Sequence, residues 1–388
     1  MRIACVAPDD LSTIIFCSTL ARLVRRRGGQ VVTISPVDLY ARELAQLATS
    51  HVALDMARFV APRADLKYVW ALYRVLRRGR FDAMIAFTTK PNIYGAVAAT
   101  LAGIGKIVIA VRGLGRAFAE PETWRDRWTQ AIVSLLYRGA CSLSTVVWFT
   151  NSSDRDSFVR KRMVDDRKVV ITKNAVDASW FSAESVSREA VHTLRHELGL
   201  RDGERTVVMV ARMNWLKGVR EFVDAARLLR SRLPNVRFIL VGPAEDGGAQ
   251  AVPAGYLRDA EKEGNFLWTG FRKEVKELYA LADIAVLPSY YKEGGYPRAL
   301  LEPMALGKPV IAADTDDCRG PVENNKNGYL VPPRDAAALA GAVLRLITEP
   351  GVAAEFGNYS RRRIESEFDE RTVVAKFLDE LTRRGVLA

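Results

Sequence analysis

The sequence predicts two consecutive α/β domains, each built on a doubly wound parallel sheet. The first observation is that short β-branched runs alternate with amphipathic helical patterns through both halves. The second is that the pattern pauses at a polar segment, residues 174–204, and then begins again. The third is size, because 388 residues, 49% of them hydrophobic, suffice for two cores. We therefore expect an N-terminal domain over residues 1–178 and a C-terminal domain over residues 179–365.

In the N-terminal half, a strand is expected wherever a short run rich in Val, Ile and Ala lies between polar or Gly-containing segments. A helix is expected wherever apolar residues recur at intervals of three and four. The strands are predicted near residues 2–6, 30–34, 83–87, 107–111, 144–149 and 168–172, and helices over 11–27, 64–78, 92–102, 122–139 and 152–161.

The C-terminal half repeats the same alternation after a hinge expected near residues 175–185. Strands are predicted near 206–211, 237–241, 265–268, 284–287 and 309–312, and helices over 217–232, 254–263, 273–281, 297–306 and 335–348. The charged tail is helical in pattern, and we expect its last part, about residues 366–388, to pack back on the N-terminal domain.

Charge divides unevenly between the halves. Residues 1–180 hold 27 lysines and arginines against 15 carboxylates, whereas the rest of the chain is balanced. Such asymmetry indicates that the first half meets an anionic partner. Segment 68–80, YVWALYRVLRRGR, has an apolar and an arginine-rich side, which is typical of a helix at a membrane surface and also of a solvated helix. Nucleic acid is disfavoured, since no binding motif accompanies the charge.

Several other classes are excluded. The N-terminus lacks the pattern of a signal peptide, and residues 131–150 are better explained as a helix and a buried strand than as a membrane span. No GxGxxG follows the first strand and no GxxxxGK occurs, which argues against a dehydrogenase and a P-loop enzyme. The cysteines show no CxxC spacing and indicate reduced thiols in a cytoplasmic protein: Cys5, Cys17, Cys141 and Cys318.

Two loops at predicted carboxyl ends of strands carry the candidate chemistry. After strand 206–211, Arg212 and Lys217 lie five residues apart and can converge on one diphosphate. After strand 284–287, a Gly-rich loop opens a helix that carries Glu302, whose carboxylate can accept two hydrogen bonds from a ribose diol. The backbone N–H groups of residues 294–296 are expected to be free for phosphate or sugar hydroxyls.

Together these segments carry a family resemblance. VARMNWLKG (210–218), EGGYPRALLEPMALGKPV (293–310) and DCRGPVENNKNGYLVPPRDAAALA (317–340) resemble the retaining glycosyltransferases of family 4. TKPNIYGAVAATLAG (89–103), VRGLG (111–115) and TNSSDRDSFV (150–159) are similar to the subgroup that extends undecaprenyl-diphosphate-linked sugars. The resemblance spans essentially the whole chain. It implies a GT-B fold, in which two Rossmann-like domains face each other across a cleft.

The resemblance also implies roles for individual residues. Arg212 and Lys217 would neutralise the donor diphosphate, and Arg112 and Glu293 would join them in catalysis. The donor would further contact Gly242, Pro243, Gly270, Phe271, Glu293, Gly294, Gly295, Tyr296 and Glu302, with Glu302 on the ribose and Gly270–Phe271 at the base. The acceptor would contact Asp10, Lys90, Asn92, Gly113 and Gly115.

Two departures from the family pattern stand out. The family's two glutamates are separated by seven residues, whereas eight lie between Glu293 and Glu302. Either the extra glycine bulges and keeps Glu293 in place, or backbone N–H groups replace it. The second departure is that Arg112 stands where many relatives have a histidine. Retention with same-face attack requires no protein base, because the leaving diphosphate can accept the proton.

The sequence therefore predicts a retaining transferase for cell-surface glycan or lipopolysaccharide assembly, acting on a polyprenyl-diphosphate-linked saccharide. We expect a UDP-linked hexose or N-acetylhexosamine as donor, no cofactor and no metal, and peripheral attachment to the inner face of the cytoplasmic membrane. Three alternatives stay open at this point: a soluble transferase acting on a small molecule, a sugar-nucleotide epimerase, and a non-catalytic sugar-nucleotide-binding protein.

Overall fold

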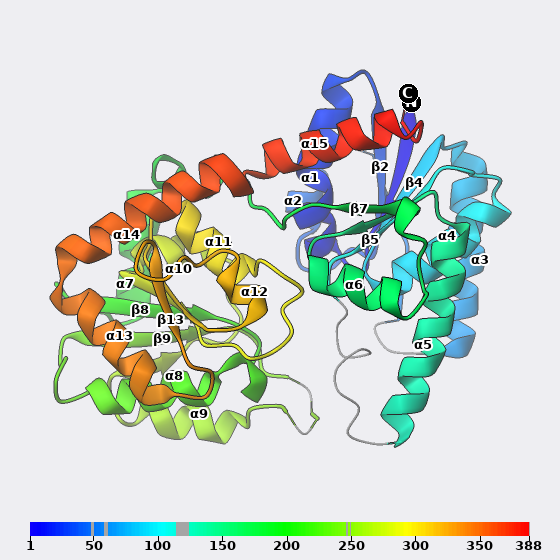
Figure 1. Cartoon of the computed structure of the whole chain (residues 1–388). Helices are drawn as coiled ribbons and strands as arrows, with labels where there is room; N and C mark the ends of the chain where they lie inside the picture. Colours follow the sequence, from blue (N-terminus) through cyan, green and yellow to red (C-terminus); the bar gives the residue numbers. More distant parts are fainter. Residues whose placement is uncertain (48–49, 58–60, 114–123, 246, 249, 388) are drawn as a thin grey trace. The chain divides into compact units, whose positions relative to one another are not determined.

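The computed structural model of the chain describes residues 1–47, 50–57, 61–113, 124–245, 247–248 and 250–387. It divides into two α/β domains (Figure 1). The N-terminal domain comprises Met1–Lys173 together with Glu370–Ala388, and the C-terminal domain comprises Asn174–Asp369.

The described part of the N-terminal domain forms a seven-stranded parallel sheet in the order β3-β2-β1-β4-β5-β6-β7. Its strands are β1 (Arg2–Val6), β2 (Gln30–Ser35), β3 (Ser50–Ala53), β4 (Ala83–Phe87), β5 (Ile107–Val111), β6 (Val146–Phe149) and β7 (Val169–Ile171). Its helices are α1 (Asp10–Arg26), α2 (Ala41–Ala45), α3 (Pro62–Gly79), α4 (Thr89–Leu101), α5 (Trp124–Leu143), α6 (Ser152–Arg160) and α15 (Glu370–Arg383).

Helices cover both faces of this sheet. Alternate strand residues such as Ile85 and Trp148 pack with α1 and α15, and their neighbours such as Met84 and Phe149 pack with α3, α4, α5 and α6. Because both faces are buried, the strands are continuous apolar runs, which is why they could be predicted from the sequence.

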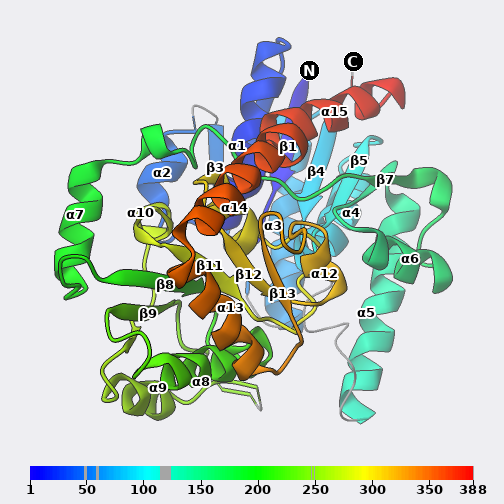
Figure 2. The ribbon, with the colours of Figure 1, turned by 60° about the vertical axis from the view of Figure 1, so that its left-hand side comes forward.

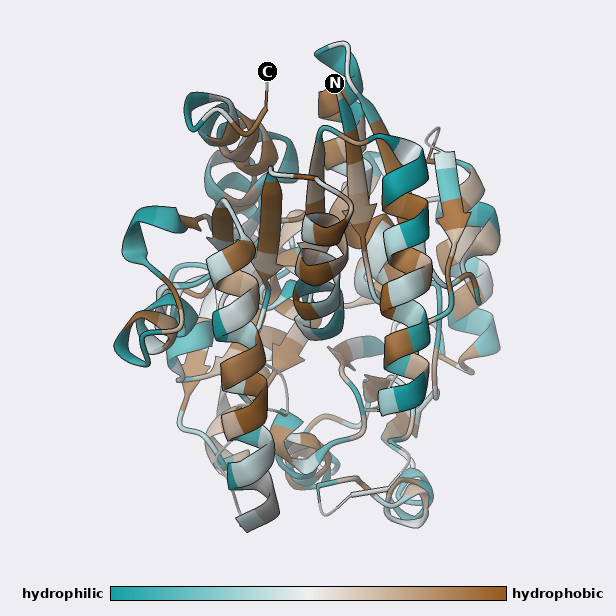
Figure 3. Cartoon of the chain, turned by 90° about the vertical axis from the view of Figure 1, so that its right-hand side faces the viewer, coloured by the Kyte–Doolittle hydropathy of each residue, from teal (hydrophilic) through white to brown (hydrophobic). Residues whose placement is uncertain are grey.

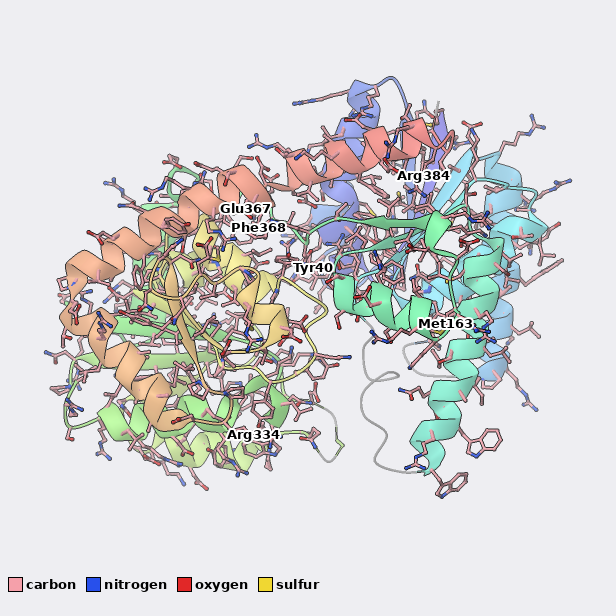
Figure 4. All side chains as sticks on the ribbon, viewed as in Figure 1. Tyr40, Met163, Arg334, Glu367, Phe368 and Arg384 are labelled. Carbon is pink, nitrogen blue, oxygen red and sulfur yellow. The ribbon has the colours of Figure 1, made fainter. Side chains whose placement is uncertain are left out.

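Helix α15 belongs to the N-terminal domain although it ends the chain. The Phe377 ring stacks on Trp148 of β6 with centroids 3.8 Å apart. Arg384, labelled in Figure 4, donates hydrogen bonds to the carbonyl oxygens of Arg167 and Val169 at 2.8 and 3.0 Å. The apolar side of this helix therefore completes one face of the N-terminal core.

In the C-terminal domain, the described residues form a six-stranded parallel sheet in the order β10-β9-β8-β11-β12-β13 (Figure 2). The strands are β8 (Arg205–Val210), β9 (Val236–Val241), β10 (Phe266–Trp268), β11 (Ile284–Leu287), β12 (Val310–Ala313) and β13 (Gly328–Val331). The helices are α7 (Arg188–Glu197), α8 (Val219–Leu229), α9 (Ala254–Glu261), α10 (Val275–Leu281), α11 (Arg298–Ala305), α12 (Asp316–Arg319), α13 (Ala336–Thr348) and α14 (Pro350–Arg363).

Five of the described strands and α-helices were not predicted from the sequence: the edge strands β3 and β13, and the helices α2, α7 and α12. Both strands lie at an edge of a sheet and pair on one side only, and β3, with the sequence SHVA, begins with two polar residues. Helix α7 lies inside the segment 174–204, which was interpreted as polar and irregular. Its apolar positions are few, and Leu194 is its buried residue.

The domain boundaries lie within a few residues of the expected positions, 178 and 365. The chain enters the C-terminal domain at Asn174, because contacts within that domain hold this segment. Asn174 Nδ2 donates to the Tyr296 carbonyl at 3.1 Å, and the Val176 N–H donates to the Phe368 carbonyl at 3.0 Å. Phe368 precedes the return of the chain at Glu370.

Among the described residues, no single helix is long and apolar enough to cross a membrane. Helix α13 and the helical segment 350–368 pass the length and composition test together, but they are bent by 101°. The apolar side of α13, including Leu339, Val343 and Leu346, is buried in the C-terminal core.

Candidate functional site

The strand order of the C-terminal sheet brings five loops to one edge. Loops that follow parallel strands all leave at the carboxyl end of the sheet. In the order of the strands, these loops contain residues 270–271 after β10, 242–245 after β9, 212–217 after β8, 289–296 after β11, and 314–317 after β12. Strand order reverses between β8 and β11, which is where doubly wound domains bind ligands.

Arg212 emerges from β8 into a polar cluster. Its Nη1 donates to Glu245 Oε1 at 2.5 Å, and Asn214 Nδ2 donates to Glu245 Oε2 at 2.9 Å. The Arg212 side chain is 43% exposed, whereas that of Glu245 is 10% exposed. The guanidinium therefore lies at the surface of the edge with a carboxylate beneath it.

Lys217 spans the reversal point of the sheet. Its ammonium donates to both carboxylate oxygens of Glu293 at 2.6 and 2.5 Å, and the two side chains are 10% and 11% exposed. The Ser289 hydroxyl donates to Glu293 Oε1 at 2.6 Å, and the Lys217 ammonium lies 4.5 Å from the centroid of the Tyr291 ring. The loops after β8 and β11 thus form one charged site.

A glycine allows these two loops to approach. Gly218 has φ of 81°, and a Cβ at this position would lie 2.3 Å from the Pro288 carbonyl oxygen. The backbone N–H groups of Tyr290 and Tyr291 both donate to the Leu216 carbonyl at 3.0 Å. Any side chain at residue 218 would push the β11 loop away from the loop that carries Lys217.

The Gly-rich turn after β11 is folded around a carboxylate. Gly294, Gly295 and Tyr296 all have positive φ, and the N–H groups of Glu293, Gly294 and Gly295 donate to Asp317 at 2.7, 3.2 and 2.8 Å. Burial raises the pKa of the Asp317 carboxyl, against the lowering effect of these donors. This corrects one expectation, because the N–H groups of residues 294 and 295 are not free.

The turn also answers the question raised by the extra glycine. Gly294 and Gly295 absorb the additional residue in the left-handed conformation, and the Glu293 carboxylate stays against Lys217. The bulge alternative is therefore the one the structure adopts. The Tyr296 ring packs on Phe368 with centroids 5.5 Å apart, so this side chain lies within the domain.

Glu302 lies in the second turn of α11 with its side chain 13% exposed. Arg298 Nε donates to Glu302 Oε1 at 2.9 Å, and Arg298 Nη1 donates to the Ala175 carbonyl at 3.0 Å. Burial raises the pKa of the Glu302 carboxyl above its usual value, while the Arg298 guanidinium lowers it. Arg298 contacts only Oε1 of this carboxylate, so Oε2 keeps acceptor capacity for a ligand hydroxyl.

The loops after β9 and β10 are joined at the same edge. The Gly242 N–H donates to the Gly270 carbonyl at 2.8 Å, and Trp268 Nε1 donates to the Gly242 carbonyl at 3.0 Å. Pro243 accepts a hydrogen bond from the Met213 N–H at 3.1 Å, which ties this loop to the one that carries Arg212. Phe271 is 44% exposed and is an aromatic side chain available for stacking.

The N-terminal domain corrects two of the expected acceptor contacts. Asn92 is fully buried, and its Nδ2 donates to the Ala110 carbonyl at 2.9 Å, so it cannot reach a bound acceptor. Asp10 is 4% exposed, and its carboxylate accepts the N–H groups of Leu11, Asp38 and Tyr40. Both residues follow the carboxyl ends of strands, as expected, but Asp10 holds the loop after β2 and Asn92 is bonded to strand β5.

The remaining residues of this domain that were expected at the site are Lys90, Arg112, Gly113 and Gly115. Lys90 Nζ donates to Asp65 Oδ1 and to the Ala57 carbonyl, both at 2.7 Å, which engages it within the domain. The Arg112 guanidinium lies over the rings of Phe16 and Trp148, 4.4 and 5.5 Å from their centroids. Gly113 follows with φ of 108°. Gly115 lies outside the described residues.

Sequence reasoning missed two carboxylates: Glu245, which faces Arg212, and Asp317, which holds the Gly-rich turn. Glu245 follows the carboxyl end of β9, a signal that could have placed it beside Arg212. Asp317 follows β12 at the same edge of the sheet, in the short helix α12. Within the described ranges, no group of three His, Cys, Asp or Glu side chains is placed to hold a metal ion.

Comparison with known families matches both domains. Residues 191–363 match the family Glycosyl transferases group 1, and residues 15–175 match the family Glycosyl transferase 4-like domain. These two matches together cover most of the chain.

Two curated relatives resemble the chain over most of its length. One is the N,N'-diacetylbacillosaminyl-diphospho-undecaprenol alpha-1,3-N-acetylgalactosaminyltransferase of Campylobacter jejuni subsp. jejuni, 25% identical over 97% of each chain. The other is the UDP-Gal:alpha-D-GlcNAc-diphosphoundecaprenol alpha-1,3-galactosyltransferase of Escherichia coli, 24% identical over 84% of this chain and 81% of that one.

Solved structures resemble the chain in fold. Anabaena HepE in complex with UDP and glucose superposes with a TM-score of 0.78 at 20% identity, covering 99% of this chain and 100% of that one. Sucrose-phosphate synthase from Thermosynechococcus elongatus gives a TM-score of 0.77 at 18% identity, covering 99% and 98%. The fold is therefore GT-B.

Proposed function

Since the chain belongs to the group 1 glycosyltransferases and has the GT-B fold, we propose that it moves a sugar from a nucleotide-diphosphate donor to a polyprenyl-diphosphate-linked saccharide. The observation that carries the donor half of this proposal is the loop after β8. It presents Arg212 and Lys217 at the reversal point of the sheet, where a diphosphate has two cations within one loop.

In this proposal the diphosphate replaces protein carboxylates. Arg212 and Lys217 are paired with Glu245 and Glu293 in the structure without donor. The phosphate oxygens then accept the hydrogen bonds that Arg212 and Lys217 donate to these carboxylates. Arg212 makes a forked contact, and Lys217 acts as a point charge. Two cations at the leaving group stabilise the charge that builds up on it in the transition state, with no metal needed.

The rest of the donor lies along the same edge. We assign the base to the backbone at Gly270 and to the exposed ring of Phe271, and the ribose diol to the Glu302 carboxylate. The transferred sugar would meet the turn at Gly294, beside Glu293. These assignments are supported by the sheet order, because the loops that follow β10, β8 and β11 all leave at the carboxyl edge of one sheet.

We propose a retaining mechanism in which the acceptor hydroxyl attacks from the face that the diphosphate leaves. The acceptor proton then passes to a phosphate oxygen of the leaving group as the new glycosidic bond forms. Arg112, stacked on Phe16 and Trp148 after β5, is the N-terminal residue that we assign to the charge at the reacting centre.

The acceptor class rests on the named relatives, two of which act on sugars linked to undecaprenyl diphosphate. The cationic excess of the N-terminal half supports it, since the acceptor is itself an anionic diphosphate in a lipid bilayer. Within this proposal the enzyme works at the inner face of the cytoplasmic membrane in cell-surface glycan assembly.

The test is calorimetric titration of the full chain with UDP and with GDP, each with and without EDTA. We expect tight binding of UDP that EDTA does not change. Turnover is then measured with UDP-linked hexoses and N-acetylhexosamines on polyprenyl-diphosphate sugars. Binding of neither nucleotide, or binding abolished by EDTA, would contradict the proposed diphosphate site. Transfer to a small soluble sugar but to no lipid-linked one would contradict the acceptor class.

A further inference from the structure

Helix α5 exposes an apolar stripe along its first turns. Trp124, Trp128, Ile132 and Leu135 are each more than half exposed. Their spacing of four, four and three residues places them on one side of the helix. Four large side chains on one side of a helix are a contiguous apolar surface, unlike the isolated exposed residues that any protein carries.

The beginning of α5 is only partly covered by its own domain, with Val133 packed against the N-terminal core. None of the described side chains at residue 124 or over residues 127–136 is buried. Burial in α5 starts at Tyr137 and continues with Ala140 and Cys141, which pack in the N-terminal core. A helix end of this length, apolar on one side, is stabilised when another apolar medium covers it.

The two neighbouring helices extend the same surface. Helix α4 packs against both α3 and α5, and Figure 3 shows the three helices side by side with hydrophobic residues along them. Leu66 and Trp70 of α3 are 72% and 61% exposed, and Leu101 of α4 is 64% exposed. The Trp70 ring stacks on Tyr73 with centroids 5.2 Å apart, which fixes an aromatic pair at this face.

The three helices carry a strong net positive charge. Together they hold nine lysines and arginines against two carboxylates in sequence. One of the two, Asp65, is buried and paired with Lys90. The exposed cations lie beside the apolar residues, on α3 and α5: Arg63, Lys67, Arg74, Arg77, Arg78, Arg127 and Arg138. Apolar and aromatic side chains bordered by cations fit the interface of an anionic bilayer.

We propose that the outer face of α3, α4 and α5 is a membrane-docking surface. Its Trp and Leu side chains enter the headgroup region of an anionic bilayer, and its arginines bind lipid phosphates. A second copy of the chain is a poorer occupant, because a two-fold contact would set this cationic face against itself. The inference rests on the proposed function only in that a lipid-linked acceptor requires the enzyme to reach a membrane.

The test is flotation of the full chain with vesicles of phosphatidylglycerol and phosphatidylethanolamine, compared with vesicles of phosphatidylcholine. The variant is W128S/L135S. The matched control is W180S/L228S, which removes one Trp and one Leu of comparable exposure from the C-terminal domain. UDP titration and thermal unfolding of each variant show that it is folded, and sedimentation without lipid gives its oligomeric state.

We expect the wild type to bind the anionic vesicles and W128S/L135S to bind them about tenfold or more weakly, since two apolar side chains no longer insert. W180S/L228S should bind like the wild type. On phosphatidylcholine the wild type should bind more weakly, by about fivefold for each cation that loses an anionic partner.

Three results would overturn the inference: no binding of the wild type to anionic vesicles, equal binding by the two double variants, or a lipid-free dimer that W128S/L135S converts to a monomer. The last result would assign the face to a second copy. Vesicle binding uses neither donor nor acceptor sugar, so a failure of the proposed transfer reaction leaves this result unchanged, and the reverse also holds.

Discussion

The Lys217–Glu293 pair allows a donor-binding role to be separated from a structural one. Both side chains are about nine-tenths buried, and the ammonium lies 2.5 and 2.6 Å from the two carboxylate oxygens. Lys217→Met removes the cation and leaves a buried carboxylate that still accepts a hydrogen bond from the Ser289 hydroxyl. Breaking a buried pair from one side costs about 3–5 kcal/mol, and we expect about 3 kcal/mol here because Ser289 still donates.

The same substitution should weaken UDP binding by about tenfold to a hundredfold, the effect of losing one hydrogen bond to a charged phosphate. The double variant K217M/E293Q removes both charges. It should recover most of the lost stability, since neither buried group is then ionised, but it should bind UDP as weakly as K217M. Urea unfolding of the C-terminal domain and calorimetric titration with UDP measure the two quantities on the same samples.

Lys262→Met is the matched control, because Lys262 forms an exposed ion pair with Asp259 in the same domain. It should change neither stability nor UDP affinity measurably. The reasoning fails if K217M/E293Q regains UDP affinity together with stability, because Lys217 would then act only through the loop. It fails also if K217M is as stable as the wild type.

Three further predictions follow from the same edge of the sheet. Gly218→Ala should destabilise the domain by about 2 kcal/mol or more and abolish UDP binding, because its Cβ meets the Pro288 carbonyl at positive φ; urea unfolding and titration check this. Arg212→Ala should leave stability within about 1 kcal/mol, since the Arg212 side chain is itself exposed and Asn214 still donates to Glu245, while UDP affinity falls about tenfold or more; unchanged affinity would remove Arg212 from the site. The third substitution is Glu302→Gln. Because the pKa of the Glu302 carboxyl is raised, the folded domain binds this proton more tightly than the unfolded chain does. The contribution of Glu302 to stability therefore falls as pH rises through the raised pKa. E302Q should therefore gain stability relative to the wild type as pH rises above the ordinary pKa of a glutamate in paired urea titrations, and a pH-independent difference would contradict it.

The sequence determined the class of fold and the place of the donor loops. Strands buried on both faces must be apolar along their length, so β8, β9, β11 and β12 could be recognised in the sequence as short continuous runs. Loops at the carboxyl ends of such strands are a position that chain order alone defines. Arg212 and Lys217 could therefore be placed at the carboxyl edge of the sheet from the sequence alone.

Only the tertiary structure decided which charges meet. Lys217 and Glu293 are 76 residues apart and become partners because the sheet order sets β11 beside β8. Asp317 likewise reaches the turn at Gly294 from the end of β12, a contact that no local pattern indicates. Asn92 has the sequence context of a ligand loop and yet is fully buried, because α4 packs it against β5. Local sequence fixes the backbone pattern and the loop ends, whereas the partner of a long polar side chain depends on strand order and burial, which are set by the packing of the whole domain.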